Sequence, residues 1–253
     1  MRNHVEEVLR AARELSEAMG GLRFGHPVAF TYNPLDYAWP GHEAYVRRFA
    51  SGEKSVLYLG MNPGPFGMAQ TGVPFGEVDA VTRWMGIRAE VGRPGVCHPK
   101  RPVQGFECPR SEVSGRRLWG LFESLYGTAE SFFAASYVAN YCPLIWMNER
   151  GANITPAQLP ADQAGLVDEA CQAHLRRLIE ILRPKILVGI GAYAARKLES
   201  AAAAFPGLEM KRGVLLHPSP ASPAANKYWP ERPMEQLREL GIIPAGAPSR
   251  RPG

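Results

Sequence analysis

Three polar side chains at the ends of predicted strands are the residues best placed for chemistry. Asn62 follows the apolar run 55–60, Asn140 lies in the run 136–141, and His217 follows the run 213–216. Taken singly, such residues are more often structural, because asparagine commonly caps turns and a lone histidine commonly holds a structural hydrogen bond. The carboxyl ends of parallel strands share one edge of a sheet, so we expect all three side chains to converge on one cleft. Two carboxamides and an imidazole could bind and activate a polar ligand there.

The segment from residue 60 to residue 77 is unusual in composition. Its sequence, GMNPGPFGMAQTGVPFGE, has five glycines and three prolines in 18 residues, and its first charge is Glu77. It is too apolar for a solvated loop and too interrupted for a helix or strand. We expect it to form a pocket wall, with Asn62, Phe66, Phe75 and Met68 facing the ligand.

Apolar runs alternate with helical segments, which predicts a single α/β domain with a central four-stranded parallel sheet covered by helices on both faces. The predicted strands are 55–60, 136–141, 185–190 and 213–216. The predicted helices are 3–19, 42–50, 78–85, 111–126, 161–182, 192–204 and 234–240. We expect residues 20–41 and 143–160 to be irregular, with the domain spanning residues 1–244 and a disordered tail over 245–253.

The composition of the chain excludes several classes of protein. With 45% hydrophobic and 21% charged residues, the 253-residue chain is expected to be globular. No apolar run approaches the roughly 20 residues of a membrane span, and the charged N-terminal helix is not an export signal. We therefore expect a cytoplasmic, nucleoid-associated protein in a bacterium, or a nuclear one in a eukaryote. The four cysteines lack metal-site spacing and are expected to be free thiols.

The formal charge of +5 would suit a polyanion-binding surface. Basic residues gather in the Gly/Pro-rich connection 86–110, namely Arg88, Arg93, Lys100, Arg101 and Arg110. This connection could be a solvated linker or a flank that contacts phosphates.

A second motif favours a different class of enzyme. Residues 189–194, GIGAYA, fit the G-x-G-x-x-A pattern of dinucleotide-binding folds between a predicted strand and helix. The motif lies late in the chain, however, and the next acidic candidate, Glu209, stands in a polar stretch. A tight strand-to-helix turn explains the glycines with fewer assumptions.

Four stretches carry a resemblance to a known family. They are the 60–77 segment, the middle run HPKRPV–GFECPRSEVSG, the strand end NYCPL at 140–144, and HPSPASPAANKYW from residue 217. Together they resemble the single-strand-selective monofunctional uracil-DNA glycosylases, part of the uracil-DNA glycosylase superfamily. The resemblance implies a uracil-DNA glycosylase-like fold and hydrolysis of the N-glycosidic bond of uracil in DNA, which initiates base excision repair. It also implies activity on 5-hydroxymethyluracil and related oxidised pyrimidines, no lyase activity, no cofactor and no metal, in a monomer acting on single- and double-stranded DNA.

The resemblance also assigns roles to individual residues. His217 corresponds to the neutral histidine that donates to O2 of the departing base, and Asn62 to the residue that positions a water molecule. Asn140 corresponds to the amide that reads N3–H and O4 of uracil. The remaining substrate-binding set is Met61, Gly64, Met68 and Phe75, with Phe75 stacking on the base and Gly64 and Met68 beside its C5 edge.

Residues 220–226, the wedge segment, resemble the loop that enters DNA where the flipped base has left. The expected DNA contacts are Pro220, Ala221, Ser222, Pro223, Ala224, Ala225, Asn226, Lys227, Lys100 and Arg101. Ala221 stands where an arginine is common in the family and Ser222 where an asparagine is, which predicts shallower insertion. A non-catalytic damaged-DNA-binding protein is the alternative, although Asn62 and His217 favour an enzyme.

Overall fold

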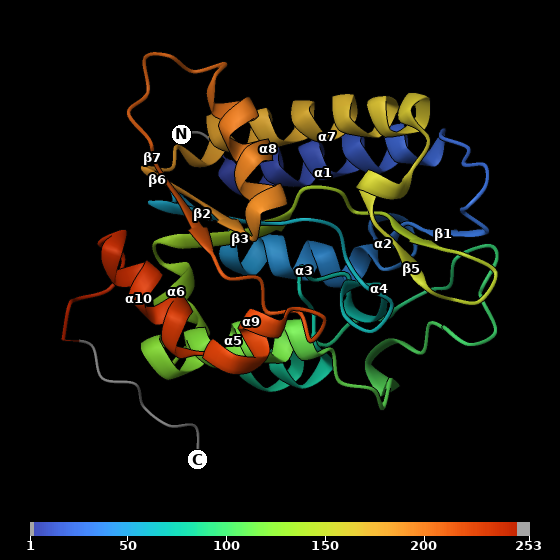
Figure 1. Cartoon of the computed structure of the whole chain (residues 1–253), viewed down its shortest axis with the longest axis horizontal. Coiled ribbons are helices and arrows are strands. Elements are labelled where there is room, and N and C mark those ends of the chain that lie inside the picture. The colour runs from blue at the N-terminus through green and yellow to red at the C-terminus, as the bar shows by residue number, and fades with distance from the viewer. Residues whose placement is uncertain (1–2, 247–253) are drawn as a thin grey trace.

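Four apolar runs form the central sheet of the computed structural model, which describes residues 3–246. They are β2 (Val56–Gly60), β3 (Ser136–Asn140), β6 (Ile186–Ile190) and β7 (Lys211–Leu215). The strands are all parallel, in the order β3-β2-β6-β7 (Figure 1). Every residue of β2 is buried, as is typical of a parallel strand covered on both faces. The prediction is confirmed, although β7 begins at the polar residues Lys211 and Arg212 because they pair along this edge with Ile186 and Leu187.

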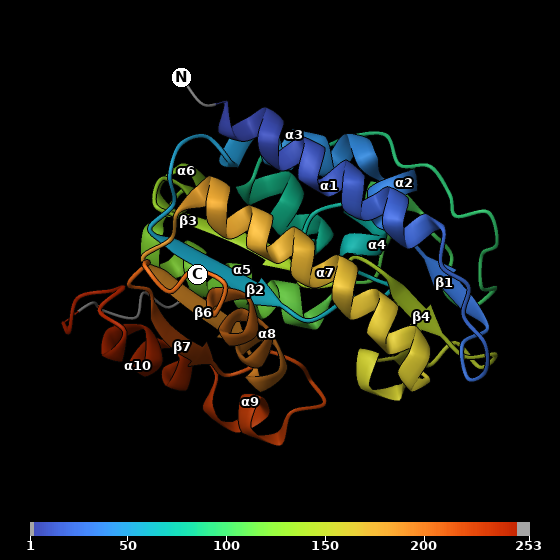
Figure 2. The ribbon, with the colours of Figure 1, turned by 90° about the horizontal axis from the view of Figure 1, so that it is seen from above.

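Helices cover both faces of the sheet. One layer contains α1 (His4–Gly20), α7 (Ala161–Leu182) and α8 (Ala192–Ala202), and the other contains α5 (Val113–Tyr126), α6 (Ala129–Phe133) and α10 (Glu231–Glu239) (Figures 1 and 2). A further helix, α3 (Trp39–Phe49), buries Tyr45, Val46 and Phe49. Relative to the prediction, α3 and α10 begin three residues earlier and α8 ends two residues earlier. The predicted α/β class with a doubly covered sheet is therefore correct.

A second, smaller sheet lies in segments that were predicted to be irregular. It is antiparallel, in the order β1-β4-β5, with β1 (Phe30–Tyr32), β4 (Ile145–Met147) and β5 (Asn153–Ile154). The prediction for residues 20–41 and 143–160 is wrong at these places, because strands of two or three residues are too short to show a period of two. Short helical turns complete the chain: α2 (Pro34–Tyr37), α4 (Met68–Thr71), η2 (Gly105–Glu107), η3 (Pro156–Gln158) and α9 (Pro223–Tyr228).

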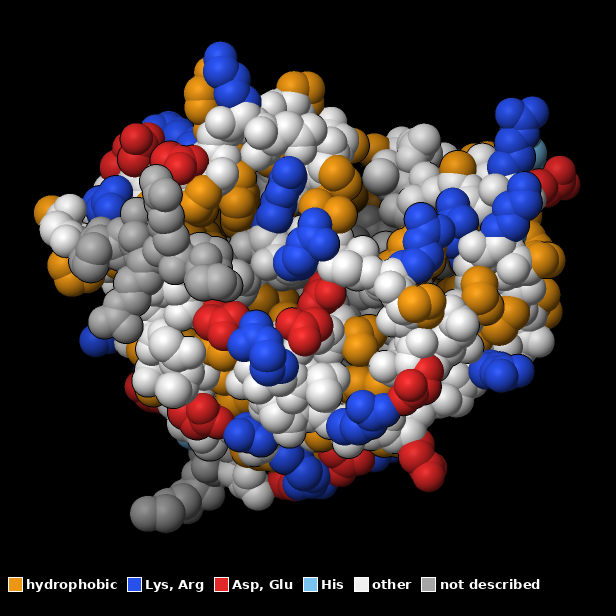
Figure 3. Space-filling view, turned by 90° about the horizontal axis from the view of Figure 1, so that it is seen from below, with side chains coloured by type: hydrophobic (Ala, Val, Ile, Leu, Met, Phe, Trp, Pro, Cys, Tyr) orange, Lys and Arg blue, Asp and Glu red, His pale blue; other side chains and the backbone are white. Residues whose placement is uncertain are grey.

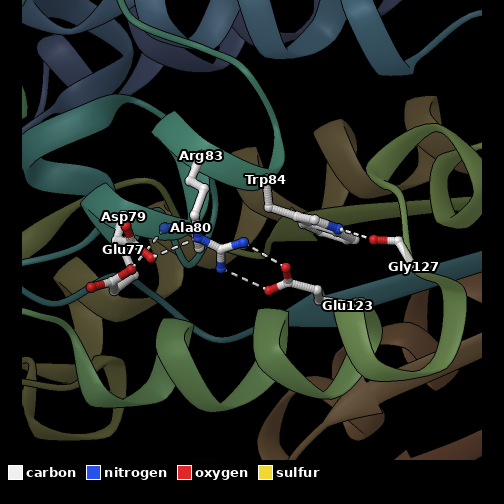
Figure 4. Close-up of polar contacts among 7 residues, drawn as sticks. All are labelled: Glu77, Asp79, Ala80, Arg83, Trp84, Glu123 and Gly127. Atoms are coloured by element: carbon white, nitrogen blue, oxygen red, sulfur yellow. Dashed lines mark hydrogen bonds and ion pairs between the residues drawn. The ribbon is translucent and has the colours of Figure 1, made fainter. Parts of the chain in front are cut away.

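The predicted helix over residues 78–85 contains a π-helical turn, η1 (Ala80–Trp84). Glu77 begins it as expected for an acidic first-turn residue, since its carboxylate accepts from the Ala80 amide at 2.9 Å. Two contacts tie η1 to α5 and the residue after it (Figure 4). Arg83 forms a bidentate pair with Glu123, with N–O distances of 2.6 and 2.8 Å, and the Trp84 indole donates to the Gly127 carbonyl at 2.9 Å. The C-terminal end of α5 is thus tied to η1.

The remaining predictions concern the termini, the cysteines and membranes. The predicted disordered tail lies mostly outside the described residues, which end at 246. All four cysteines are free thiols. Between residues 3 and 246, no helix has the length and apolar character needed to cross a membrane.

Candidate active site

A cavity of about 560 Å³ opens at the carboxyl edge of the parallel sheet. Its walls come from the loop after β2, the start of α5 and the loop after β7. The predicted residues on its lining are Met61, Asn62, Gly64, Met68, Phe75, Asn140, His217, Pro220 and Ala221. Strand ends that are distant in sequence therefore bring the two carboxamides and the imidazole to one hollow, as open parallel sheets do.

The side-chain amide of Asn62 is held in one orientation. Its Nδ2 donates to the Leu144 carbonyl at 3.2 Å. Its Oδ1 is buried and has no hydrogen-bond partner. Because a buried carbonyl oxygen without a partner is costly, this atom is available to accept a hydrogen bond from a ligand or a water molecule. An asparagine held in this way can orient a water molecule but cannot deprotonate it.

The ring of His217 is fixed in one tautomer. The Ser219 amide donates to Nδ1 at 3.2 Å, so Nδ1 carries no proton and the neutral ring bears its proton on Nε2. Burial lowers the pKa of His217 below its ordinary value of 6.5. The neutral ring is therefore a hydrogen-bond donor through Nε2 at physiological pH.

The glycines of the 189–194 motif serve packing around this histidine. A Cβ at Gly191, whose φ is +90°, would lie 3.2 Å from Cβ and Cδ2 of His217. A Cβ at Gly189 would lie 2.3 Å from the Ala195 amide nitrogen. These contacts account for the G-x-G-x-x-A pattern as a close strand-to-helix turn, without a dinucleotide.

Asn140 and Phe75 meet across Gly60. Gly60 pairs with Asn140 in the sheet, and a Cβ at Gly60 would lie 2.5 Å from Phe75 Cε2 and 2.6 Å from Asn140 Oδ1. The Asn140 Nδ2 faces the opposite way and donates to Met68 Sδ at 3.4 Å. An aromatic face and an oriented amide thus lie next to each other, and together they could stack on a planar ring and form hydrogen bonds with its edge.

The backbone of Phe75 is strained. Its φ of 50° is in the left-handed region, which non-glycine residues seldom occupy. The Phe75 carbonyl accepts from the Trp119 indole at 2.8 Å and from the Glu77 amide at 2.7 Å. Such strain persists where surrounding contacts enforce it, and it concentrates at functional sites. Trp119 lies on α5.

Glu112 also lines the cavity, and the sequence analysis missed it. It is the N-cap residue of α5 and accepts from the Gly115 amide at 3.1 Å. Burial raises the pKa of Glu112 to about 7, with a further increase from the charge of Glu77 and an opposing effect of the Gly115 amide. The residue lies inside the GFECPRSEVSG run, but the sequence does not distinguish a functional glutamate at this position from one that only caps the helix.

The wedge segment is partly helical, which the sequence analysis did not predict. Ser222 caps α9, its Oγ accepting from the Ala225 amide at 3.3 Å, so residues 223–227 form a helical turn and do not line the cavity. Arg117 of α5 holds the segment, donating to the Pro218 carbonyl at 3.1 Å and to Asn226 Oδ1 at 2.9 Å. Pro220 and Ala221 are the members of the segment at the cavity.

The arginines of the basic connection have different partners among the described residues. Arg88 pairs with Glu107. Arg101 and Arg110 instead place their guanidinium carbons 5.5 and 4.4 Å from the ring centroid of Phe66, at the cavity rim. Lys100 is exposed and does not line the cavity. On the face that carries α5 and α9, Lys and Arg side chains are spread among acidic ones rather than gathered in one patch (Figure 3).

Metal-ligating side chains do not cluster in the described part of the chain. Residues 3–246 contain no group of three or more His, Cys, Asp or Glu side chains that could hold a metal ion. Among the described residues, the cavity lining offers the amides of asparagine side chains, the imidazole of His217 and the carboxyl group of Glu112.

Comparisons with known proteins identify the family of the chain. A family model described as the uracil DNA glycosylase superfamily matches residues 48–238. The chain is 49% identical over 240 residues to the single-strand selective monofunctional uracil-DNA glycosylase of Rattus norvegicus, covering 95% of this chain and 84% of the relative. The protein of the same name from Bos taurus is 47% identical over 243 residues, covering 96% and 89%. The solved structure of Pedobacter heparinus SMUG2 matches with a TM-score of 0.62 at 16% identity, over 91% of this chain and 94% of that chain, a likeness of fold alone.

Proposed function

Because the chain belongs to the uracil-DNA glycosylase superfamily, we propose that it is a monofunctional glycosylase that hydrolyses the bond between deoxyribose and uracil in DNA. The proposal extends to 5-hydroxymethyluracil and related oxidised pyrimidines, and the reaction would begin base excision repair. The observation that supports it most is the convergence of Asn62, Asn140 and His217 on one cavity at the sheet edge. Single- and double-stranded DNA is the expected partner, with the base flipped into the cavity.

His217 would stabilise the leaving group. When the glycosidic bond breaks, negative charge develops on the base, chiefly at O2 and O4. The protonated Nε2 of a neutral His217, fixed by the Ser219 amide, would donate to O2. Loss of a donor aimed at developing charge typically costs about 2.7–4 kcal/mol in the transition state.

Asn62 would place the attacking water. Its Oδ1 is the buried acceptor without a partner, and the Leu144 carbonyl prevents the amide from turning round. An amide cannot take the proton of the water, so the water attacks a sugar that already has cationic character. We therefore expect a dissociative reaction, slower than that of a relative with aspartate at this position.

Asn140 and Phe75 would select the base. Face-to-face stacking on Phe75 would position the base. The Asn140 side-chain amide would accept a hydrogen bond from N3–H and donate one to O4 of uracil. Cytosine presents an acceptor at N3 and a donor at N4, the opposite pattern, and is rejected because buried polar groups would be left unpaired. Gly64 and Met68 border the C5 edge of the base.

A single-uracil oligonucleotide tests this function and separates it from the alternative. We expect strand cleavage only after hot alkali, because a monofunctional glycosylase leaves an intact abasic strand. Cleavage without alkali would indicate lyase activity, and none after alkali would favour a non-catalytic damaged-DNA-binding protein. His217→Ala and Asn62→Ala should each lose most excision while binding to uracil-containing DNA persists. His4→Ala, at the first turn of α1 and outside the cavity, is the matched control.

A further inference from the structure

Within the described part of the chain, Glu112 carries the one carboxyl group on the cavity lining, and this group lies against the loop of residues 64–68. A Cβ at Gly67 would lie 2.6 Å from Glu112 Oε2 and 2.7 Å from its Cδ, and a Cβ at Gly64 would lie 3.8 Å from Oε1. The carboxyl therefore fills the space that a side chain at residue 67 would occupy. The loop of residues 64–68 and the start of α5 therefore pack closely against each other at the Glu112 carboxyl group.

Among the described residues, the Gly115 amide is the sole hydrogen-bond partner of this carboxyl, and no basic side chain forms an ion pair with it. Its second oxygen, Oε1, is left as an acceptor on the cavity wall. A partly buried carboxylate without a counter-charge is costly to hold. Its helix-capping bond alone does not require a glutamate, since serine, threonine, aspartate or asparagine caps a helix as well.

The position of Glu112 relative to a bound base follows from Asn140, and this step rests on the proposed function. The Asn140 Nδ2 lies beside Met68 Sδ, so the donor end of the reading amide faces the loop of residues 64–68. That donor would meet O4 of the base, and C5 is the ring atom next to C4. The C5 substituent is thereby directed toward this loop and toward the Glu112 carboxyl behind it.

We propose that Glu112 determines substrate preference: its free oxygen accepts a hydrogen bond from a donor carried on C5, such as a hydroxymethyl group, and this bond offsets the repulsion between its charge and the departing anionic base. A hydrogen bond to a charged acceptor is stronger than one between neutral groups. For uracil, which has no such donor, the ionised carboxyl raises the free energy of the anionic leaving base by repulsion. Glu112 thus favours 5-hydroxymethyluracil over uracil, because only 5-hydroxymethyluracil gains the hydrogen bond that offsets this repulsion.

Two oligonucleotides of identical sequence, one with uracil and one with 5-hydroxymethyluracil, test this at pH 8. Glu112→Gln should raise kcat/KM on uracil and lower it on 5-hydroxymethyluracil, so that the ratio of the second to the first falls about tenfold. Glutamine retains an oxygen that can accept from the Gly115 amide. The melting temperature of the Glu112→Gln variant shows whether it is folded. Glu107→Gln, on an exposed residue outside the cavity, should leave the ratio unchanged.

Should Glu112→Gln fail to fold, the wild-type ratio measured from pH 5.5 to pH 8.5 serves instead. Burial raises the pKa of Glu112 to about 7, so the ratio should rise across this range as the carboxyl ionises. The other charged or titratable groups around it are Glu77, Arg110 and His217, and a change at His217 acts on both substrates and cancels in the ratio. An active wild type with a flat ratio, or a folded Glu112→Gln with the wild-type ratio, would overturn the inference alone. Wild-type inactivity on both bases would overturn the proposed function and the inference with it.

Discussion

Gly60→Ala perturbs the candidate site without removing any functional group. The added Cβ would lie 2.5 Å from Phe75 Cε2 and 2.6 Å from Asn140 Oδ1, whereas ordinary contact begins at 3.4 Å. The ring and the reading amide must therefore each move by about 1 Å, and a displacement of that size typically costs about 10²-fold in rate. Because Gly60 lies in β2, the overpacking should also reduce the free energy of unfolding by about 1–3 kcal/mol.

The assay is single-turnover excision from a single-uracil oligonucleotide, combined with thermal unfolding to establish that the variant is folded. We expect kcat/KM to fall about 10²-fold. The preference for uracil over cytosine should also weaken, because the displaced Asn140 amide no longer forms well-aligned hydrogen bonds with the base. Gly120→Ala is the matched control, since a Cβ at this position in α5 meets nothing within 4 Å. A folded Gly60→Ala with the wild-type kcat/KM would refute the placement of Phe75 and Asn140 around the base.

Three further predictions test other parts of the molecule. Asn140→Asp should shift activity toward cytosine, because a protonated carboxyl can donate to N3 and accept from N4; unchanged rates on cytosine-containing DNA would contradict the reading role. Burial lowers the pKa of His42 and of His174 from 6.5 to about 4, so below pH 6.5 the unfolded chain binds protons that the folded chain does not. Stability is therefore full above pH 6.5 and falls toward pH 4, by up to about 3 kcal/mol for each histidine, and urea unfolding of His42→Asn should show a shallower pH dependence than wild type. Ala221→Arg should raise excision from duplex DNA more than from single strands, since a longer side chain at the cavity mouth could occupy the gap left by the base; equal changes on both substrates would argue against insertion.

The parallel sheet could be predicted because β2 and β6 are continuous apolar runs, as strands buried on both faces require, whereas the polar, largely exposed start of the edge strand β7 was not predicted. The antiparallel sheet could not, because β5 has two residues and depends on pairing with β4 rather than on its own pattern. Helix α9 follows a Ser-Pro pair at 222–223, a cap and first-turn signal that a proline-rich context concealed. The π-helical character of η1 has no signature in its sequence.

Within the candidate site, the residues at strand ends were predictable because topology alone gathers them on one edge. Glu112 was not, because its contact with Gly67 arises from how α5 packs on the loop, and nothing local distinguishes it from an ordinary cap. The strained φ of Phe75 was equally hidden, since it depends on the Trp119 indole from a helix that begins 38 residues later. Both features thus depend on how α5 packs against a loop that is distant in sequence, which local sequence patterns do not show.

Helix α5 connects three parts of the candidate site. Its cap residue Glu112 borders the base cavity, Trp119 fixes the ring that would stack on the base, and Arg117 grips the segment that would enter the strand. Near the C-terminal end of the same helix, Glu123 pairs with Arg83 of η1. A DNA strand that contacts the segment after β7 would therefore act on the same helix that borders the cavity, and we expect binding of the strand and recognition of the base to be coupled.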